Sequence, residues 1–249
     1  MKIFIDSADL DEIKEVYSWG IIEGITTNPS LIKKANEKLR KKRVSFNDYI
    51  KEILIIAKNT PVSLEVTTTN HKNMVKEGEA LYKKFNPVAK NVYIKVPIDP
   101  CFEKSCSWDM DGVKTIKELS KSGIPVNATL IFTPEQALIA SKAGAKFVSP
   151  YVGREDDFIK EKRMKTKSKK KIDDKGIYSG IDLIKKCKEI LKNEKTEVLA
   201  ASIRNPRQLR EAALAGADIV TAPYKVLKDS LKHKKTFEGM KRFVKDSVY

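Results

Sequence analysis

The sequence has few of the residues on which many active sites depend. Its 249 residues include three cysteines and two histidines, too few for a disulfide framework or a histidine-based metal centre. We therefore expect reduced thiols at Cys101, Cys106 and Cys187, and no bound metal. The chain contains no run of about 18 apolar residues, which excludes a transmembrane helix.

Two further features are missing. An acidic residue, Asp6, follows the first five residues directly, too early for the apolar stretch of a secretory signal peptide. Together with the scarce cysteines, this indicates a cytoplasmic location. No glycine-rich phosphate-binding loop of the G-x-G-x-x-G or Walker type occurs after any apolar run, which argues against a nucleotide-binding open sheet.

Positive charge, by contrast, is in excess. The chain has 49 Lys and Arg against 33 Asp and Glu, a formal net charge of +16. Much of the excess lies in two stretches, residues 33–43 and 160–175, which we interpret as solvated Lys-rich insertions in loops or at helix ends. A basic nucleic-acid-binding protein is an alternative of a different class. No nucleic-acid motif or interleaved aromatic residues support it, so a nucleic-acid partner is not favoured.

Short apolar, β-branched runs alternate with amphipathic stretches along the whole chain. They recur about every 31 residues, the length of one βα unit. Eight such units predict a single α/β domain over residues 1–249, a (β/α)8 TIM barrel with an extra C-terminal helix. A doubly wound open sheet is the alternative. The expected strands are 2–6, 24–27, 62–67, 91–96, 125–130, 147–151, 197–201 and 218–221. The expected helices are 8–19, 46–58, 71–85, 111–121, 134–143, 179–192, 206–215, 225–232 and 237–249.

Polar residues stand at nearly every expected strand end, where the active sites of such barrels form. Lys95 lies in an apolar strand, and if it points inward, burial should lower the pKa of its amine. A neutral amine can attack a carbonyl carbon and form a Schiff base. Glu65 and Asp6 are candidate acid/base groups for that chemistry, or simply ion partners of Lys95. An outward-pointing lysine at the strand end is the other possibility.

Other strand-end residues have both a structural and a functional interpretation. Asp6 and Asn28 could be helix N-caps. Arg154 and Arg204 follow the sixth and seventh strands, where they could be surface charges or could clamp a phosphate together with Ser202.

Five segments carry a family resemblance. Residues 24–32 (GITTNPSLI) resemble the second-strand signature of transaldolases, and residues 93–97 (YIKVP) are similar to the strand that carries their Schiff-base lysine. Residues 127–132 (NATLIF), 148–154 (VSPYVGR) and 200–206 (AASIRNP) resemble the motifs of strands five, six and seven. Their order and spacing match across essentially the whole chain. The size resembles the short, single-domain branch that includes fructose-6-phosphate aldolase.

The resemblance implies a transaldolase of the pentose phosphate pathway. It would transfer a dihydroxyacetone unit from sedoheptulose 7-phosphate to glyceraldehyde 3-phosphate through a Schiff base on Lys95, without a cofactor. Carried over residue by residue, the catalytic set is Lys95, Asp6, Glu65 and Thr129. The substrate-binding set is Thr27, Asn28, Asn127, Ser149, Tyr151, Arg154, Ser202 and Arg204.

The resemblance leaves two activities open. The family's transaldolases have Glu and Phe where this sequence has Glu65 and Tyr151, whereas its fructose-6-phosphate aldolases have Gln and Tyr. We favour transaldolase, because Glu65, unlike a glutamine, can hold and give a proton. An aldolase that releases free dihydroxyacetone is the alternative. The branch also forms rings through its terminal helix, and residues 237–249 have an apolar stripe. We therefore expect a homo-oligomer, a decamer or a pentamer.

Overall fold

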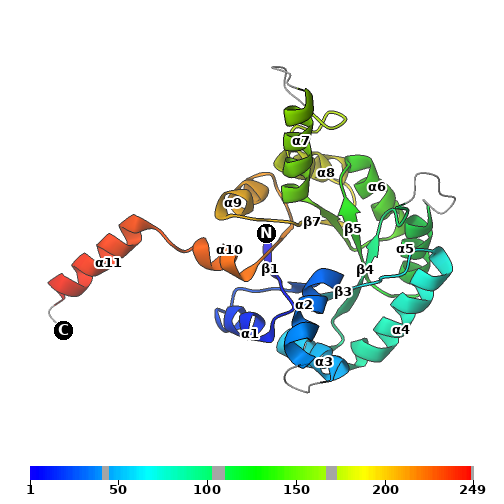
Figure 1. The fold of residues 1–249 in the computed structure, drawn as a ribbon, viewed down its shortest axis with the longest axis horizontal. Helices are drawn as coiled ribbons and strands as arrows, with labels where there is room; N and C mark the ends of the chain where they lie inside the picture. Colours follow the sequence, from blue (N-terminus) through cyan, green and yellow to red (C-terminus); the bar gives the residue numbers. More distant parts are fainter. Residues whose placement is uncertain (41–44, 103–109, 167–172, 248–249) are drawn as a thin grey trace.

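Eight short parallel strands follow one another around a closed barrel, and β8 pairs with β1 to complete it (Figure 1). The computed structural model describes residues 1–40, 45–102, 110–166 and 173–247. The strands are β1 (Lys2–Asp6), β2 (Ile25–Thr26), β3 (Val62–Glu65), β4 (Val92–Pro97), β5 (Val126–Ile131), β6 (Phe147–Pro150), β7 (Glu197–Ala200) and β8 (Ile219–Ala222).

Helices surround the barrel, except that the last one extends away from it (Figure 1). None of the helices in the described part of the chain is both long enough and apolar enough to span a membrane. The helices are α1 (Leu10–Ser18), α2 (Pro29–Arg40), α3 (Phe46–Ile56), α4 (His71–Ala89), α5 (Asp111–Lys121), α6 (Pro134–Ala143), α7 (Val152–Thr166), α8 (Gly180–Ile190), α9 (Pro206–Leu214), α10 (Tyr224–Asp229) and α11 (Lys234–Asp246).

The TIM-barrel prediction is confirmed, and part of each Lys-rich stretch lies at a helix end, one of the two placements expected for them. Residues 33–40 continue α2 and residues 160–166 continue α7, so both stretches begin as the ends of helices. Lysine, arginine and glutamate are good helix formers, which helps these polar segments stay helical. Residues 41–43 and 167–172 lie outside the described residues.

Side chains of the strands alternate between the barrel interior and the helix layer. In β4, Ile94 and Val96 belong to the large core between strands and helices, whereas Tyr93 packs against an inner cluster around Phe4 and Phe147. Lys95, two residues after Tyr93, faces the same side as Tyr93, because strand side chains have a period of two. Lys95 is therefore an inward-pointing lysine.

Aromatic rings fill the end of the barrel where the strands begin. The Phe147 ring stacks on Tyr93 with centroids 4.8 Å apart and meets Phe4 edge-on at 6.1 Å. Gly24 makes room for this packing, because a Cβ there would lie 2.5 Å from the Phe4 ring. The filled end leaves the opposite end, where the strands finish, for a cavity.

The cysteines do not all match the expectation of reduced thiols. Cys187 is a free thiol on the buried side of α8. Cys101 is disulfide-bonded, so the expectation is wrong there. Cys106 lies outside the described residues.

One carboxyl group is buried in the first turn of α7. Glu155 is 1% exposed, and its Oε1 accepts no hydrogen bond from the described residues. Burial, and then the nearby carboxylate of Asp174, raise the pKa of Glu155 to about 7, while Lys162 opposes them. The folded state therefore holds this proton more tightly than the unfolded chain, whose glutamates titrate near 4.5.

We predict that Glu155→Gln stabilises the fold at high pH only. Because its pKa is raised in the folded state, Glu155 makes its full contribution to the free energy of unfolding below about pH 4.5. As the pH rises through 7, the fold loses roughly 3 kcal/mol of that free energy. Because glutamine stays neutral, the variant should gain up to that amount at pH 8 and almost nothing at pH 4.5. Denaturant unfolding at the two pH values measures this. Glu161→Gln, at an exposed position on the same helix, is the control. Equal effects of Glu155→Gln at both pH values would contradict the prediction.

Candidate active site

A cavity of about 290 Å³ opens at the carboxyl ends of the strands. Most of the residues predicted from the sequence line it: Asp6, Asn28, Glu65, Lys95, Ser149, Tyr151, Arg154 and Ser202. They come from six strands or the loops that follow them, far apart along the chain. The closed barrel therefore brings residues that are distant in the sequence into one cavity.

Lys95 is the central group of the cavity. Its side chain is only 5% exposed, and its Nζ lies 3.0 Å from Glu65 Oε2 and donates a hydrogen bond of 3.2 Å to the carbonyl oxygen of Thr27. Burial lowers the pKa of the amine, but Tyr151, Glu65 and Asp6 together raise it above its ordinary value. The expectation that burial makes Lys95 a neutral amine is wrong, because carboxylates surround it. The resting lysine is an ammonium in an ion pair.

Strand pairing and one loop fix the position of Glu65. Glu65 and Lys95 are direct partners in the register of β3 and β4, and Val66 N–H donates to the Lys95 carbonyl. Beyond the strand, the Glu77 carboxylate of α4 accepts hydrogen bonds from the amides and hydroxyls of both Thr67 and Thr68. Both sides of Glu65 are thus held, which keeps its carboxylate beside the lysine.

Asp6 ends β1 and lines the same cavity. Thr26 Oγ1 donates a hydrogen bond of 2.8 Å to Asp6 Oδ1. Burial raises the pKa of Asp6, and Lys95, Thr26 and Arg154 oppose that rise. Asp6 does not cap α1, because Asp9 does. Its position beside Lys95 suits an acid/base role.

A fully buried polar layer supports the cavity from behind. Ser149 Oγ donates to Asn127 Oδ1 at 2.6 Å, and Asn127 Nδ2 donates to Ser63 Oγ at 3.1 Å. The hydroxyl of Thr129 lies 3.0 Å from that of Tyr151. Asn127 and Thr129 have no exposed surface and do not line the cavity. In this state they orient Ser149 and Tyr151, which do.

Of two further predicted residues, Thr27 stands outside the lining and Asn28 is part of it. Thr27 Oγ1 donates to the carbonyl oxygen of Ser63, so only its backbone oxygen reaches Lys95. Asn28 lines the cavity, and it also caps α2, since its Oδ1 accepts from Leu31 N–H at 3.0 Å. Its amide nitrogen makes no hydrogen bond with the described residues and can therefore contact a ligand.

The start of α7 provides the positive end of the cavity. Arg154 lies 5.0 Å above the centroid of the Tyr151 ring, a cation–π arrangement. Gly153 N–H donates to the Ser202 carbonyl, and a Cβ on Gly153 would lie 2.5 Å from that oxygen. The close backbone approach places Ser202 beside the helix N-terminus, a favourable position for an anion.

Arg204 does not reach the cavity in this structure. Its guanidinium makes two contacts with the Asp157 carboxylate, at 2.7 Å to Oδ1 and 2.6 Å to Oδ2. The prediction that Arg204 faces a phosphate beside Arg154 and Ser202 is therefore not met here, because a carboxylate one turn along α7 already holds it.

Sequence reasoning also assigned no role to several residues that line the cavity, among them Thr26, Leu130 and Thr221. Thr26 and Thr221 are inward positions near strand ends, so the period of two could have found them. Leu130 could not be found that way. A register shift between Ala128 and Ile131 marks a bulge, and Leu130 has a φ of +58°. The bulge turns a side chain inward that regular alternation would point outward.

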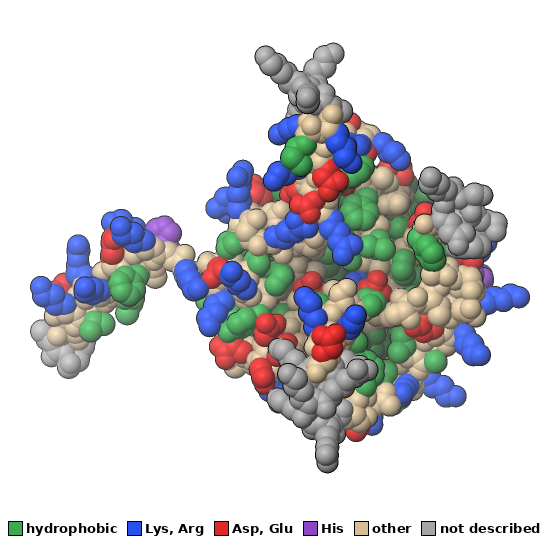
Figure 2. Space-filling model, viewed as in Figure 1, with side chains coloured by type: hydrophobic (Ala, Val, Ile, Leu, Met, Phe, Trp, Pro, Cys, Tyr) green, Lys and Arg blue, Asp and Glu red, His purple; other side chains and the backbone are tan. Residues whose placement is uncertain are grey.

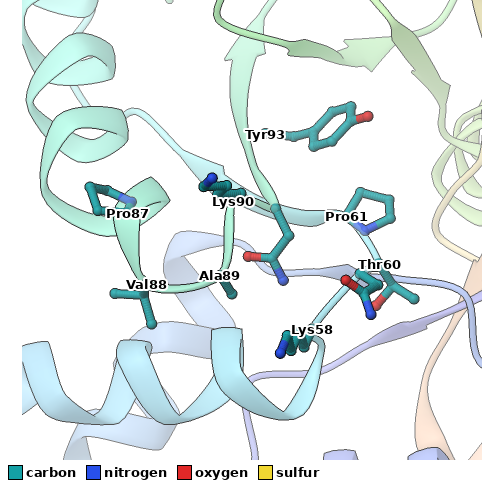
Figure 3. Close-up of a pocket in the computed structure, with 10 residues that line it drawn as sticks. Lys58, Thr60, Pro61, Pro87, Val88, Ala89, Lys90 and Tyr93 are labelled. Carbon is teal, nitrogen blue, oxygen red and sulfur yellow. The ribbon is translucent and has the colours of Figure 1, made fainter.

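A larger hollow lies at the other end of the barrel. It has a volume of about 430 Å³ between the turn after α3 and the turn after α4. Figure 3 shows Lys58, Thr60 and Pro61 on one side of it and Pro87 to Lys90 on the other. None of the predicted site residues lines it, and reacting groups in such barrels occupy the opposite end. The cavity around Lys95 is therefore the candidate active site.

Comparison with known proteins supports the same assignment. A family described as transaldolase/fructose-6-phosphate aldolase matches residues 3–247. A probable transaldolase of Leptospira biflexa is 42% identical over 249 residues, covering 99% of this chain and 98% of the relative. A probable transaldolase of Caldicellulosiruptor saccharolyticus is 43% identical over 249 residues, covering 99% and 96%. One of Geobacillus kaustophilus is 42% identical over 248 residues, covering 99% and 98%. The chain belongs to the transaldolase/fructose-6-phosphate aldolase family.

Proposed function

We propose that this protein is a cytoplasmic transaldolase in which residues 1–249 act as one domain. It would convert sedoheptulose 7-phosphate and glyceraldehyde 3-phosphate into erythrose 4-phosphate and fructose 6-phosphate, a step of the pentose phosphate pathway. The observation that carries the proposal is the ion pair of Lys95 with Glu65 inside a cavity that Asp6 also lines. A buried amine next to two carboxylates suits imine chemistry on a ketose.

Imine formation would begin with loss of a proton from the Lys95 ammonium. Glu65, 3.0 Å away, is the nearest acceptor. The free amine then adds to C2 of the ketose phosphate, and the resulting carbinolamine loses its hydroxyl as water. Glu65 would return a proton to the departing oxygen, and Thr129 would act on that water through the Tyr151 hydroxyl to which it is hydrogen-bonded. The product is a protonated imine between Nζ and C2.

Carbon–carbon cleavage would follow. Asp6 removes the proton from the C4 hydroxyl, the C3–C4 bond breaks, and its electron pair moves into the protonated imine to give an enamine. Erythrose 4-phosphate leaves as the aldehyde product. The enamine then attacks the aldehyde carbon of glyceraldehyde 3-phosphate, Asp6 returns the proton, and hydrolysis of the new imine releases fructose 6-phosphate.

Binding of the substrate would use the rest of the cavity. Arg154, Ser202 and the N-terminus of α7 form an anion site, and Arg204 joins it if the phosphate replaces Asp157 as its partner. Asn28 and Ser149 offer polar groups for sugar hydroxyls, supported by Thr27 and Asn127 behind them. The distribution separates phosphate recognition from the reacting amine.

Borohydride trapping tests the lysine assignment. Reduction of the enzyme in the presence of fructose 6-phosphate should attach the substrate carbon skeleton irreversibly to Lys95, and peptide mass spectrometry should locate it. Lys95→Met should abolish both trapping and activity, by a factor of roughly 10³ or more. Lys146→Met, an exposed lysine on the barrel surface, is the matched control and should behave like the native enzyme. A label on another residue would overturn the mechanism.

One observation favours a second activity, fructose-6-phosphate aldolase. The Tyr151 hydroxyl lies 3.0 Å from that of Thr129, which places a proton donor beside the cavity. Such a donor could protonate the enamine carbon, so that free dihydroxyacetone leaves instead of being transferred. Glu65, which holds and returns a proton itself, favours transfer.

The ratio of transfer to release separates the two activities. With fructose 6-phosphate as donor and erythrose 4-phosphate as acceptor, we expect transfer to exceed release of free dihydroxyacetone. Tyr151→Phe should lower the release rate further, by roughly tenfold if the hydroxyl acts as a general acid, and leave transfer largely intact. Release as fast as transfer in the native enzyme would assign it as an aldolase.

We further propose that the enzyme is a homo-oligomer held by α11, a pentamer or a decamer. No residue of α11 is buried, and Phe237, Met240, Phe243 and Val244 are each more than half exposed. Figure 2 shows hydrophobic side chains together along one side of this helix, which projects from the barrel. An apolar stripe of this kind fits a second copy of the chain.

Light scattering tests the assembly. The native protein should form a particle several times heavier than the 28.2 kDa chain. Phe243→Asp should dissociate it or reduce its mass, because a charge would then lie in an apolar interface. Arg242→Ser, on the opposite side of α11, should keep the native mass. A native particle of one chain would refute the proposal.

A further inference from the structure

Three side chains from adjacent strands form a short hydrogen-bonded chain in the cavity. Thr26 Oγ1 lies 2.8 Å from Asp6 Oδ1 and 2.6 Å from Thr221 Oγ1. β1 lies between β2 and β8 in the barrel, so all three point inward from neighbouring strands. Thr26 and Thr221 are each 2% exposed, and both line the cavity with Lys95. The mechanism proposed above gives neither threonine a role.

The number of hydrogens fixes the direction of this chain. A threonine hydroxyl carries one hydrogen and can accept two more, whereas an ionised carboxylate only accepts. When Asp6 is ionised, Thr26 must donate its one hydroxyl hydrogen to Oδ1. The contact between the two threonines must then be made by the hydrogen of Thr221. The order is therefore Thr221 to Thr26 to Asp6.

This order has two consequences for Asp6. The donated hydrogen bond occupies Oδ1, while Oδ2 accepts none from the described residues, so Oδ2 is the oxygen left to take a proton from a substrate. The bond is also charge-assisted, and a donor that is itself polarised by a second donor binds the carboxylate more strongly. The two hydroxyls thus orient the carboxylate and favour its ionised form, against the effect of burial.

We propose that Thr221, acting through Thr26, is a positioning residue that holds the Asp6 carboxylate ready to act as the base. The proposal rests on the transaldolase function proposed above, because it assigns a supporting role to a group used in that mechanism. It predicts that the threonines matter in the carbon–carbon cleavage step and not in the formation of the imine.

Other charged groups also face Asp6 and must stay constant in a test. The positive charges of Lys95 on β4 and Arg154 on α7 favour the ionised carboxylate. Glu65 on β3 and Tyr151 after β6 act on Lys95, whose charge in turn acts on Asp6. The neighbouring strands β2 and β8 contribute the neutral threonines. Changing a threonine to valine leaves each of these charges in place, so a shift in the titration of Asp6 reports on the hydroxyl chain.

The experiment compares variants that differ by single atoms. Thr221→Val keeps the shape of the side chain and removes its hydroxyl, Thr221→Ser keeps the hydroxyl, and Thr26→Val removes the direct donor. Thr115→Val, in α5, is the matched control, because it removes another buried hydroxyl far from Asp6. For each variant we would measure the pH profile of kcat for cleavage and the extent of borohydride trapping on Lys95.

The expected result is a split between the two measurements. The acid limb of the kcat profile should move up by about one pH unit in Thr26→Val and about half a unit in Thr221→Val, since charge-assisted hydrogen bonds are the strong ones. Cleavage at neutral pH should fall by roughly tenfold in Thr221→Val. Trapping should stay at the native level. Thr221→Ser and Thr115→Val should match the native enzyme in both measurements.

Three outcomes would count against one proposal or the other. If Thr221→Val has the native pH profile while native enzyme is trapped and active, the role of Thr221 is refuted and the proposed function stands. If Thr221→Val loses trapping and cleavage in parallel, Thr221 serves the structure of the cavity and does not position Asp6. If the native enzyme forms no trapped adduct with fructose 6-phosphate, the proposed function itself fails.

Discussion

The buried charge of Lys95 determines the arrangement of the carboxyl end of this barrel. An ammonium removed from water without counter-charges would be strongly destabilising. Here Glu65 provides one counter-charge at 3.0 Å, and Asp6 provides a second. Each of these carboxylates then requires its own support: the register of β3 and β4 for Glu65, and a hydroxyl of Thr26 for Asp6. The polar lining of the cavity follows from the burial of a single cation.

The same constraint makes the period-two alternation of the strands critical. A shift of β4 by one residue would turn Lys95 out of the barrel and Ile94 into the cavity. The aromatic end opposes such a shift, because Tyr93 points inward beside Lys95 and stacks on Phe147. The packing that fills one end of the barrel thus sets the orientation of the reactive group at the other end.

The sequence predicts the groups of this site better than their interactions. Strand order and the strand-end rule identify Lys95, Glu65 and Asp6, because these depend only on topology and local pattern. The raised pKa of Lys95 could not be predicted, since burial and nearby carboxylates act in opposite directions and only distances decide between them. The inward turn of Leu130 depends on a bulge, which the alternation of inward and outward residues along β5 does not predict.

Arg204 shows the same limit, because its ion pair with Asp157 could not be read from the sequence, and this pair bears on the phosphate site proposed above. Lys95 and Arg154 balance Asp6 and Glu65 in the cavity, so a phosphate dianion would bring uncompensated negative charge. Arg204 lies close by in an ion pair with Asp157 in which both side chains are about half exposed. Pairs with that exposure contribute about 0–1 kcal/mol, so exchanging Asp157 for a phosphate costs little. Arg154 already lies over the Tyr151 ring and lines the cavity, so its role in the proposed site would need no such exchange. In the proposed phosphate site, Arg154 would be in place before binding, and Arg204 would join it by leaving a weak partner.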